Sequence, residues 1–145
     1  MAQGAIPGRV PRIPPANCDL THGNVYVTIS LMPLRVIEYV RADGSIPYAA
    51  WFADLPAQAA AKVATARARL EMGNTSAVKW LGAIGEYRID WGPGYRIYLG
   101  KEGDDVIILL GGGTKRRQRI DIERAEMLWQ EYKSRKAAQF KPKGR

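Results

Sequence analysis

A chain of 145 residues and 16.1 kDa is long enough for one hydrophobic core, and 46% hydrophobic with 25% charged residues is ordinary for a globular protein. The single cysteine, Cys18, and the single histidine, His22, exclude an internal disulfide, a cysteine-cluster metal site and a mechanism built on two histidines, so we expect no metal or other cofactor. The net charge of +8 and the pI near 9.8 indicate a polyanionic partner.

The excess positive charge belongs to one end of the chain. Between residues 33 and 114 nine basic residues balance nine acidic ones, whereas residues 115–145 hold eleven basic and four acidic residues. No apolar run approaches the roughly 20 residues that span a bilayer, and the start lacks the residue order of a secretory signal. We therefore expect a cytoplasmic protein without a membrane partner.

Residues 1–32 are punctuated by prolines and glycines and show no sustained helical period. We expect this extension to be mostly disordered, although the run from Val25 to Ile29 could add an edge strand. A mis-assigned translation start is the alternative, because Met32 stands directly before the first strong strand. An intact mass of the natively expressed protein that includes residues 1–31 would refute that alternative.

The next forty residues predict one strand and two antiparallel helices. Residues 34–40 alternate β-branched and polar side chains, which is typical of a strand. Pro47 opens a short helix over residues 48–54 with its aromatic residues on one face. Pro56 opens a second, alanine-rich helix that runs to about Met72 and is stopped by a Gly-Asn pair.

The hydrophobic period then changes from 3.6 to 2. Four strand-length segments follow, over residues 78–84, 86–91, 95–101 and 106–110, with turns at 85, 92–94 and 103–104. A run of three glycines, 111–113, leads through a basic segment into a last helix from about Ile120 to Lys136. This order predicts an α+β domain in which a small curled antiparallel sheet carries the helices on one face. We expect a single domain over residues 33–138 and a basic flexible tail over residues 139–145.

The residues of the predicted meander narrow the choice of family. Residues 86–90 (EYRID), 94–98 (GYRIY) and 107–113 (IILLGGG), with the basic residues after them, resemble the pattern of the RelE/ParE superfamily of type II toxin-antitoxin modules. The chain is more closely similar to the HigB-like branch, the addiction module killer proteins, which residues 36–40, 49–52 and 121–125 also fit. The resemblance covers about residues 33–136. It implies a RelE/ParE-like fold, with two N-terminal helices packed on the sheet and a C-terminal helix.

The resemblance also implies a function. Toxins of this type are usually ribosome-dependent mRNA endonucleases, or mRNA interferases, that use the 2′-hydroxyl of RNA as an internal nucleophile and need no metal. The reaction requires an in-line phosphate, neutralisation of the charge that develops on its oxygens, and two proton transfers. The implied partners are the ribosome, mRNA and a helical DNA-binding antitoxin encoded nearby, which neutralises the toxin.

Arginine suits the neutralisation of phosphate charge because it stays ionised and binds phosphate bidentately. The resemblance supports catalytic roles for Arg96, which matches the arginine of the Gly-Tyr-Arg strand, for Arg88 on the preceding strand, and for Arg116 after the last strand. Further RNA contacts are expected from Lys115, Arg117, Arg119 and Tyr95.

Each of these roles has a purely structural alternative. Arg96 could pair with Asp90 or Glu86 across the hairpin. The tyrosines of the meander, Tyr95 among them, are expected to pack the sheet, although one beside the basic residues could stack on RNA. The basic run, residues 115–119, places positive charges at the N-terminus of the last helix, which is the positive end of the helix dipole. Because this arrangement is unfavourable for the helix, it favours a functional reason for the run.

One departure from the family pattern concerns proton transfer. Several mRNA-cleaving members carry a tyrosine or histidine near the start of the last helix, where this chain has residues 120–122 (IDI). Asp121, Glu123, Glu86 or a lysine of lowered pKa could replace it, or cleavage could depend more on charge stabilisation. Two other functions stay open: a ParE-like inhibitor of DNA gyrase without nuclease activity, and a non-toxic nucleic-acid-binding accessory domain.

Overall fold

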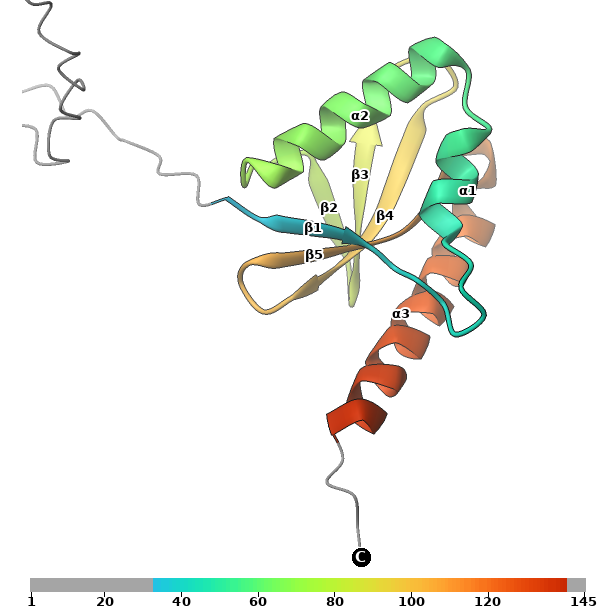
Figure 1. The fold of residues 1–145 in the computed structure, drawn as a ribbon. Helices are drawn as coiled ribbons and strands as arrows, with labels where there is room; N and C mark the ends of the chain where they lie inside the picture. Colours follow the sequence, from blue (N-terminus) through green and yellow to red (C-terminus); the bar gives the residue numbers. More distant parts are fainter. Residues whose placement is uncertain (1–32, 141–145) are drawn as a thin grey trace, which may run out of the picture. The chain divides into compact units, whose positions relative to one another are not determined.

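The computed structural model of the chain describes residues 33–140, and these form an α+β domain of five strands and three α-helices. The elements follow in the order β1 (Arg35–Glu38), α1 (Pro47–Ala53), α2 (Ala57–Glu71), β2 (Val78–Leu81), β3 (Ile84–Ile89), β4 (Tyr95–Glu102), β5 (Val106–Thr114), the short 3-10 helix η1 (Lys115–Arg117) and α3 (Gln118–Phe140) (Figure 1). The predictions for residues 1–32 and for 141–145 lie outside the described residues.

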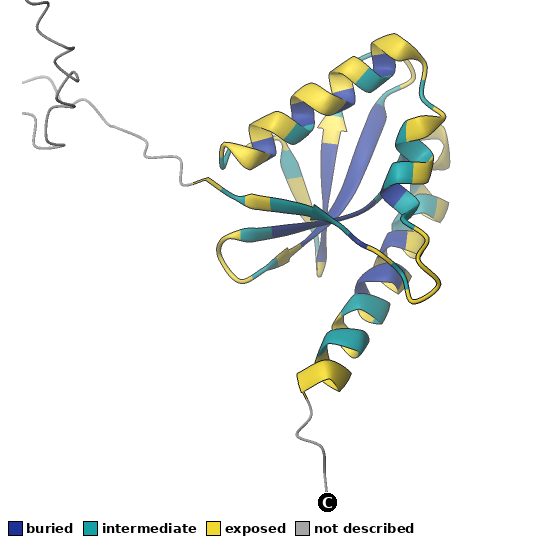
Figure 2. Ribbon diagram, in the orientation of Figure 1, coloured by how far each residue is buried: buried dark blue, intermediate teal, exposed yellow. Residues whose placement is uncertain are grey.

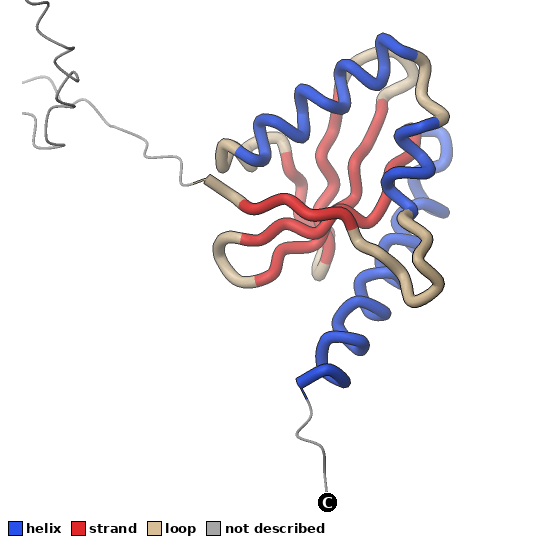
Figure 3. The backbone as a smooth tube through the Cα atoms, viewed as in Figure 1, coloured by secondary structure: helices blue, strands red, loops and turns tan. Residues whose placement is uncertain are grey.

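The strands form one mixed sheet in the order β1-β5-β4-β3-β2 (Figure 3). The pairs from β2 to β5 are antiparallel, as predicted, but β1 runs parallel to β5, with Arg35 opposite Val106 and Glu38 opposite Leu109. The prediction of a purely antiparallel sheet is therefore wrong at this edge. The reason is that α1, α2 and strands β2 to β4 separate β1 from β5 in sequence, so nothing within either strand indicates how the two pair.

Helices cover both faces of the sheet, so the prediction of helices on one face is wrong for α3 (Figures 1 and 2). The face covered by α1 and α2, the α2 face, is built from Tyr48, Val63, Ala66, Leu70, Tyr87, Ile97, Leu99, Ile107 and Leu109. The face covered by α3, the α3 face, is built from Tyr39, Ile84, Tyr98, Ile108, Leu110, Ala125, Leu128 and Trp129. The central strands are buried in unbroken runs because both of their faces are covered.

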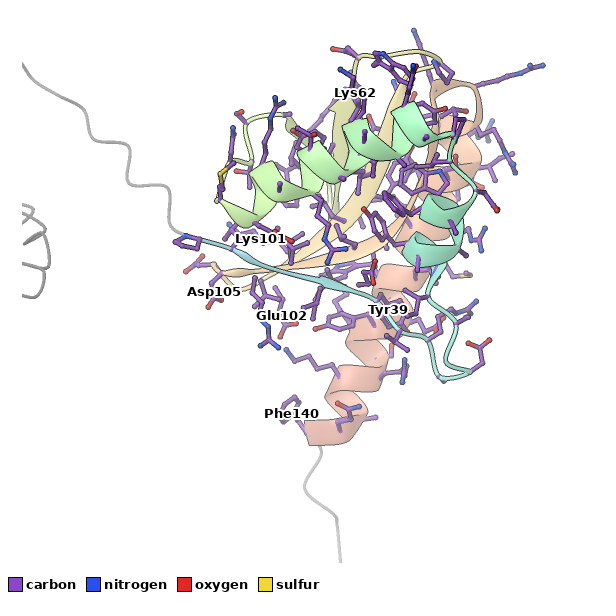
Figure 4. The ribbon with its side chains drawn as sticks, turned by 45° about the horizontal axis from the view of Figure 1, so that its top comes forward. Tyr39, Lys62, Lys101, Glu102, Asp105 and Phe140 are labelled. Carbon is purple, nitrogen blue, oxygen red and sulfur yellow. The ribbon has the colours of Figure 1, made fainter. Side chains whose placement is uncertain are left out.

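Helix α2 packs one side against the sheet: its buried residues, which recur at the 3.6-residue period of a helix, are Ala59, Val63, Ala66 and Leu70. Lys62 extends from the opposite side of the helix (Figure 4). Helix α3 is longer than predicted and continues past Lys136 to Phe140, so the first two residues of the predicted tail are helical (Figure 4). An ion pair between Arg41 and Glu131, 3.0 Å long, and another between Lys136 and Glu102 hold its C-terminal half to the rest of the domain.

Two glycine positions differ from the prediction. The β2–β3 turn lies at Gly82, which has a φ of +73°, and not at Gly85, which is part of β3. A side chain at Gly85 would meet Val78 at 2.7 Å and Leu99 at 2.9 Å from its Cβ, so packing accounts for that glycine. Strand β5 also continues through the glycine run to Thr114 instead of ending before it.

Candidate functional site

The site begins with two arginines on adjacent strands. Arg88 of β3 and Arg96 of β4 are directly opposite each other in the antiparallel register, and both belong to the α3 face. Like charges at such positions repel each other. Glu86 relieves this repulsion: its Oε1 accepts a 2.7 Å hydrogen bond from Arg88 Nε and lies 3.5 Å from Arg96 Nε.

Glu86 is fully buried, and α3 completes its surroundings. Its Oε2 accepts a 2.9 Å hydrogen bond from Nε2 of Gln118, the first residue of α3. Burial by itself raises the pKa of Glu86, but the hydrogen bonds from Arg88 and Gln118 and the charges of the two arginines hold the pKa below its ordinary value. Glu86 is therefore an ionised carboxylate that fixes the arginines in place.

The two arginines differ in accessibility. Arg96 is only 7% exposed, its Nη1 donates a 3.0 Å hydrogen bond to the carbonyl of Gly94, and its buried Nε has no hydrogen-bond partner. The Arg88 side chain is 40% exposed. The ion pair with Glu86, which the sequence left open as the structural alternative for Arg96, is present, and Arg88 is the more accessible arginine of the two.

The basic run after β5 lies beside Arg96. The amide of Lys115 donates a 2.9 Å hydrogen bond to the same Gly94 carbonyl that Arg96 binds. Lys115, Arg116 and Arg117 are exposed, and none of them forms an ion pair with any other residue in the 33–140 range. Arg119 is different, because it pairs with Glu123 on its own helix at 3.5 Å while 93% of its side chain is exposed.

Tyr95 is not part of this arrangement. It neighbours Arg96 in the strand and so faces the opposite side of the sheet, where it is buried with its ring stacked on Trp91 at 6.1 Å. The tyrosine on the α3 face is Tyr98, opposite Glu86 in the register. The expectation for the tyrosines of the meander, packing with stacking on RNA as the alternative, did not single out Tyr98, although its position two residues after Arg96 places both side chains on one face.

A cleft of about 420 Å³ adjoins this site between α1 and α3, over the end of β5. The glycine run forms part of its wall, Trp51 and Asp54 line it from α1, and Arg117, Asp121 and Arg124 line it from η1 and α3. A register shift at Tyr98 and Leu99 inserts Leu110 as an extra residue of β5, and Leu110 also lines the cleft. Such bulges redirect side chains near functional sites.

Two buried polar atoms of the residues around the cleft have no hydrogen-bond partner: the Tyr98 hydroxyl and Oδ2 of Asp121. Burial raises the pKa of Tyr98, and the nearby carboxylates of Glu86 and Asp121 raise it further. Burial also raises the pKa of Asp121, against the opposing charges of Arg117 and Arg124. Two carboxylates on one face thus have pKa values shifted in opposite directions, a pattern common at functional sites.

Of the carboxylates that sequence analysis proposed for proton transfer, Glu123 is exposed and paired with Arg119. Glu86 is occupied by Arg88 and Gln118. Of these three residues, only Asp121 has a buried acceptor atom without a hydrogen-bond partner, and that atom is turned toward Gly113, where a Cβ atom would overlap the carboxylate. Within residues 33–140, no cluster of acidic, histidine or cysteine side chains could hold a metal ion, and no helix is long and apolar enough to cross a membrane.

No family model matches the sequence. An uncharacterized protein of Haemophilus influenzae is 38% identical to the chain over 94 residues, which are 63% of this chain and 95% of that protein. The chain therefore belongs to the same family as the Haemophilus influenzae protein.

Proposed function

We propose that this chain is the toxin of a type II toxin-antitoxin module, a RelE/ParE superfamily member of the HigB-like branch that cleaves mRNA on the ribosome. The observation that carries the proposal is the arginine pair, Arg88 and Arg96, held by a buried carboxylate beside three exposed cations, Lys115, Arg116 and Arg117. The order of elements, one strand, two helices, a meander and a C-terminal helix, also agrees with that fold.

The proposed reaction is transfer of the phosphodiester to the neighbouring 2′-hydroxyl. The 2′-oxygen bonds to phosphorus as the bond to the 5′-oxygen breaks, so the products are a 2′,3′-cyclic phosphate and a 5′-hydroxyl, and one proton passes from the nucleophile to the leaving oxygen through solvent. Arg88, with Arg116 or Lys115, neutralises the charge that develops on the phosphate oxygens. Arg96 and Glu86 position Arg88 and do not touch the substrate, because both are buried.

Induction of the chain without antitoxin tests the proposal. We expect growth arrest and new 5′ ends within translated regions of mRNA. Arg88→Gln should lower the cleavage rate by about 10²- to 10³-fold, the usual effect of removing one transition-state donor. Arg69→Gln is the matched control, because Arg69 is an exposed arginine of α2 without an ion pair among the described residues, and it should cleave like the wild type.

Growth arrest with uncut transcripts would contradict the endonuclease. That result would support the second candidate, a ParE-like inhibitor of DNA gyrase, which the occupation of both Glu86 oxygens by Arg88 and Gln118 favours, because the carboxylate at the arginine pair is then not free to transfer a proton. Gyrase supercoiling measured with the purified chain would then decide. Viable cells at full expression would contradict both and leave a non-toxic accessory domain.

The proposed antitoxin would supply acidic or apolar groups to the cationic face, because exposed unpaired cations attract complementary charge. Coexpression with the product of the neighbouring reading frame should restore growth. Failure to restore growth would remove that product as the cognate antitoxin.

A further inference from the structure

Gly111 gives the first indication that the cleft between α1 and α3 takes a ligand. A Cβ atom at Gly112 would overlap the Trp51 ring, and one at Gly113 would overlap the Asp121 carboxylate, so packing explains both of these glycines. A Cβ atom at Gly111 would meet nothing within 4 Å. Packing does not require a glycine there, whereas a glycine in a strand is suited to the close approach of a ligand.

The polar groups around the cleft give a second, independent indication. The Tyr98 side chain is 1% exposed, and its hydroxyl has no hydrogen-bond partner. Oδ2 of Asp121 has none either. Leaving such groups unpaired lowers stability, and a ligand that donates to Asp121 would recover part of that loss.

The remaining lining determines the class of ligand. Trp51 offers aromatic surface, which suits the face of a planar ring, and the buried side chains of Leu110 and Leu128 lie beneath the cleft. Arg117 and Arg124 line the cleft without ion pairs to the other residues of the described domain, so they are available to an anion. A volume of about 420 Å³ is within the range of small-molecule sites.

We propose that this cleft binds one nucleotide of the RNA substrate, with its base inside and its phosphate on Arg117 and Arg124. The base carries an exocyclic amino group, which donates to Asp121 once that side chain turns from Gly113 toward the ligand. A carboxylate accepts from an amino group and repels a carbonyl oxygen at the same place, so cytosine is accepted and uracil is not. This inference rests on the proposed function and adds the substrate subsite that gives it base selectivity.

Nucleotide binding to the full-length chain tests this subsite without any cleavage. Cytidine and uridine 5′-monophosphates differ at position 4 of the base, where one has an amino group and the other a carbonyl. The Trp51 indole N–H signal in an NMR spectrum, assigned with Trp51→Phe, should shift on titration with cytidine monophosphate and require about tenfold more uridine monophosphate. Equal responses to the two nucleotides, or none, would overturn the proposal.

Two variants test nucleotide binding at the cleft without disrupting the fold. Gly111→Val should abolish the nucleotide response and preserve the fold, because its side chain enters the cleft from a position where a Cβ atom would meet nothing within 4 Å. Asp121→Asn should still bind but should lose the preference for cytidine over uridine monophosphate. A Gly111→Val chain that binds like the wild type would contradict the assignment of the cleft.

The outcomes also separate this inference from the proposed function. Base-selective binding by a chain that leaves transcripts uncut would retain the subsite and reject the nuclease. Cut transcripts with a Trp51 signal that responds to no nucleotide would retain the nuclease and reject the subsite. A Trp51 signal that responds to the antitoxin but to no nucleotide would assign the cleft to a protein segment and overturn the proposal.

Discussion

The two faces of the sheet are built on different principles. The nine core residues of the α2 face are aliphatic or aromatic, whereas the two buried charged residues of the described domain, Glu86 and Arg96, are both on the α3 face. The α3 face also carries the unpartnered hydroxyl of Tyr98. Burying charge and leaving polar atoms unpaired lowers stability. The α2 face therefore stabilises the fold, and the α3 face gives up stability to hold groups that a functional site needs.

The largest effect should follow the removal of Glu86. Glu86→Ala leaves Arg96 buried without its carboxylate, which should lower the free energy of unfolding by about 3–5 kcal/mol. Urea unfolding followed by tryptophan fluorescence measures the change. The double variant Glu86→Leu with Arg96→Leu should regain most of the loss, because it leaves no buried charge. A double variant no more stable than Glu86→Ala would show that these charges stabilise the α3 face.

A comparable loss on the α2 face should have a different cause. Leu99→Ala creates a cavity at a fully buried position and should lower the free energy of unfolding by about 2–5 kcal/mol, with no charge involved. Met72→Ala, at a residue that is 57% exposed, is the control and should change it by less than about 0.5 kcal/mol. Equal effects of Leu99→Ala and Met72→Ala in urea unfolding would contradict the stabilising role of the α2 face.

The pH dependence should distinguish the two carboxylates of the α3 face. The pKa of Glu86 is lowered, so its contribution to stability is present above its ordinary pKa of 4.5 and is lost as the pH falls through the lowered value. The pKa of Asp121 is raised, so the folded state binds its proton more tightly. Stability therefore falls as the pH rises from the ordinary pKa of 3.8 through the raised value.

Substitution of Glu86 and Asp121 should reveal the opposite pH dependences of their contributions to stability. Relative to the wild type, Asp121→Asn should be more stable at neutral pH, and this advantage should shrink in acid. Glu86→Gln should be less stable at neutral pH, and its deficit should shrink in acid. Urea unfolding of both variants from acid to neutral pH measures the two trends. Parallel trends would contradict the assignment of opposite pKa shifts.

The comparison of the faces also shows what sequence can predict. The stripe of α2 was predictable because a 3.6-residue period with alanine and valine indicates one buried side. The pairing of β1 with β5 was not, because it joins strands about 70 residues apart and depends on the whole intervening chain. The side of the sheet that α3 covers was not predictable either, since an amphipathic helix fits against any apolar face.

The site was predictable in part. Two arginines on consecutive antiparallel strands indicated a shared cationic face, and the structure brings Arg88 and Arg96 together. The sequence also allows the prediction that Tyr95 lies outside the site, because Tyr95 and Arg96 are adjacent in one strand and adjacent residues of a strand face opposite sides of the sheet. The burial of Arg96 was not predictable, because it requires α3, which supplies Gln118, to cover the same face.

The smallest expected effect separates two exposed arginines at the rim of the α3 face. Arg116 forms no ion pair in the described part of the chain, whereas Arg119 pairs with Glu123. If Arg116 contacts an RNA phosphate, Arg116→Ala should reduce the slope of log affinity against log salt by about 0.7, the value for one single-strand contact. Arg119→Ala should leave that slope nearly unchanged and alter stability by less than about 1 kcal/mol, because an exposed pair contributes little. Filter binding of a short RNA at several salt concentrations measures both slopes. Equal slopes for the two variants would mean that Arg119 leaves Glu123 and binds an RNA phosphate instead. Ion pairing within the protein would then not determine which cations of the basic run bind RNA.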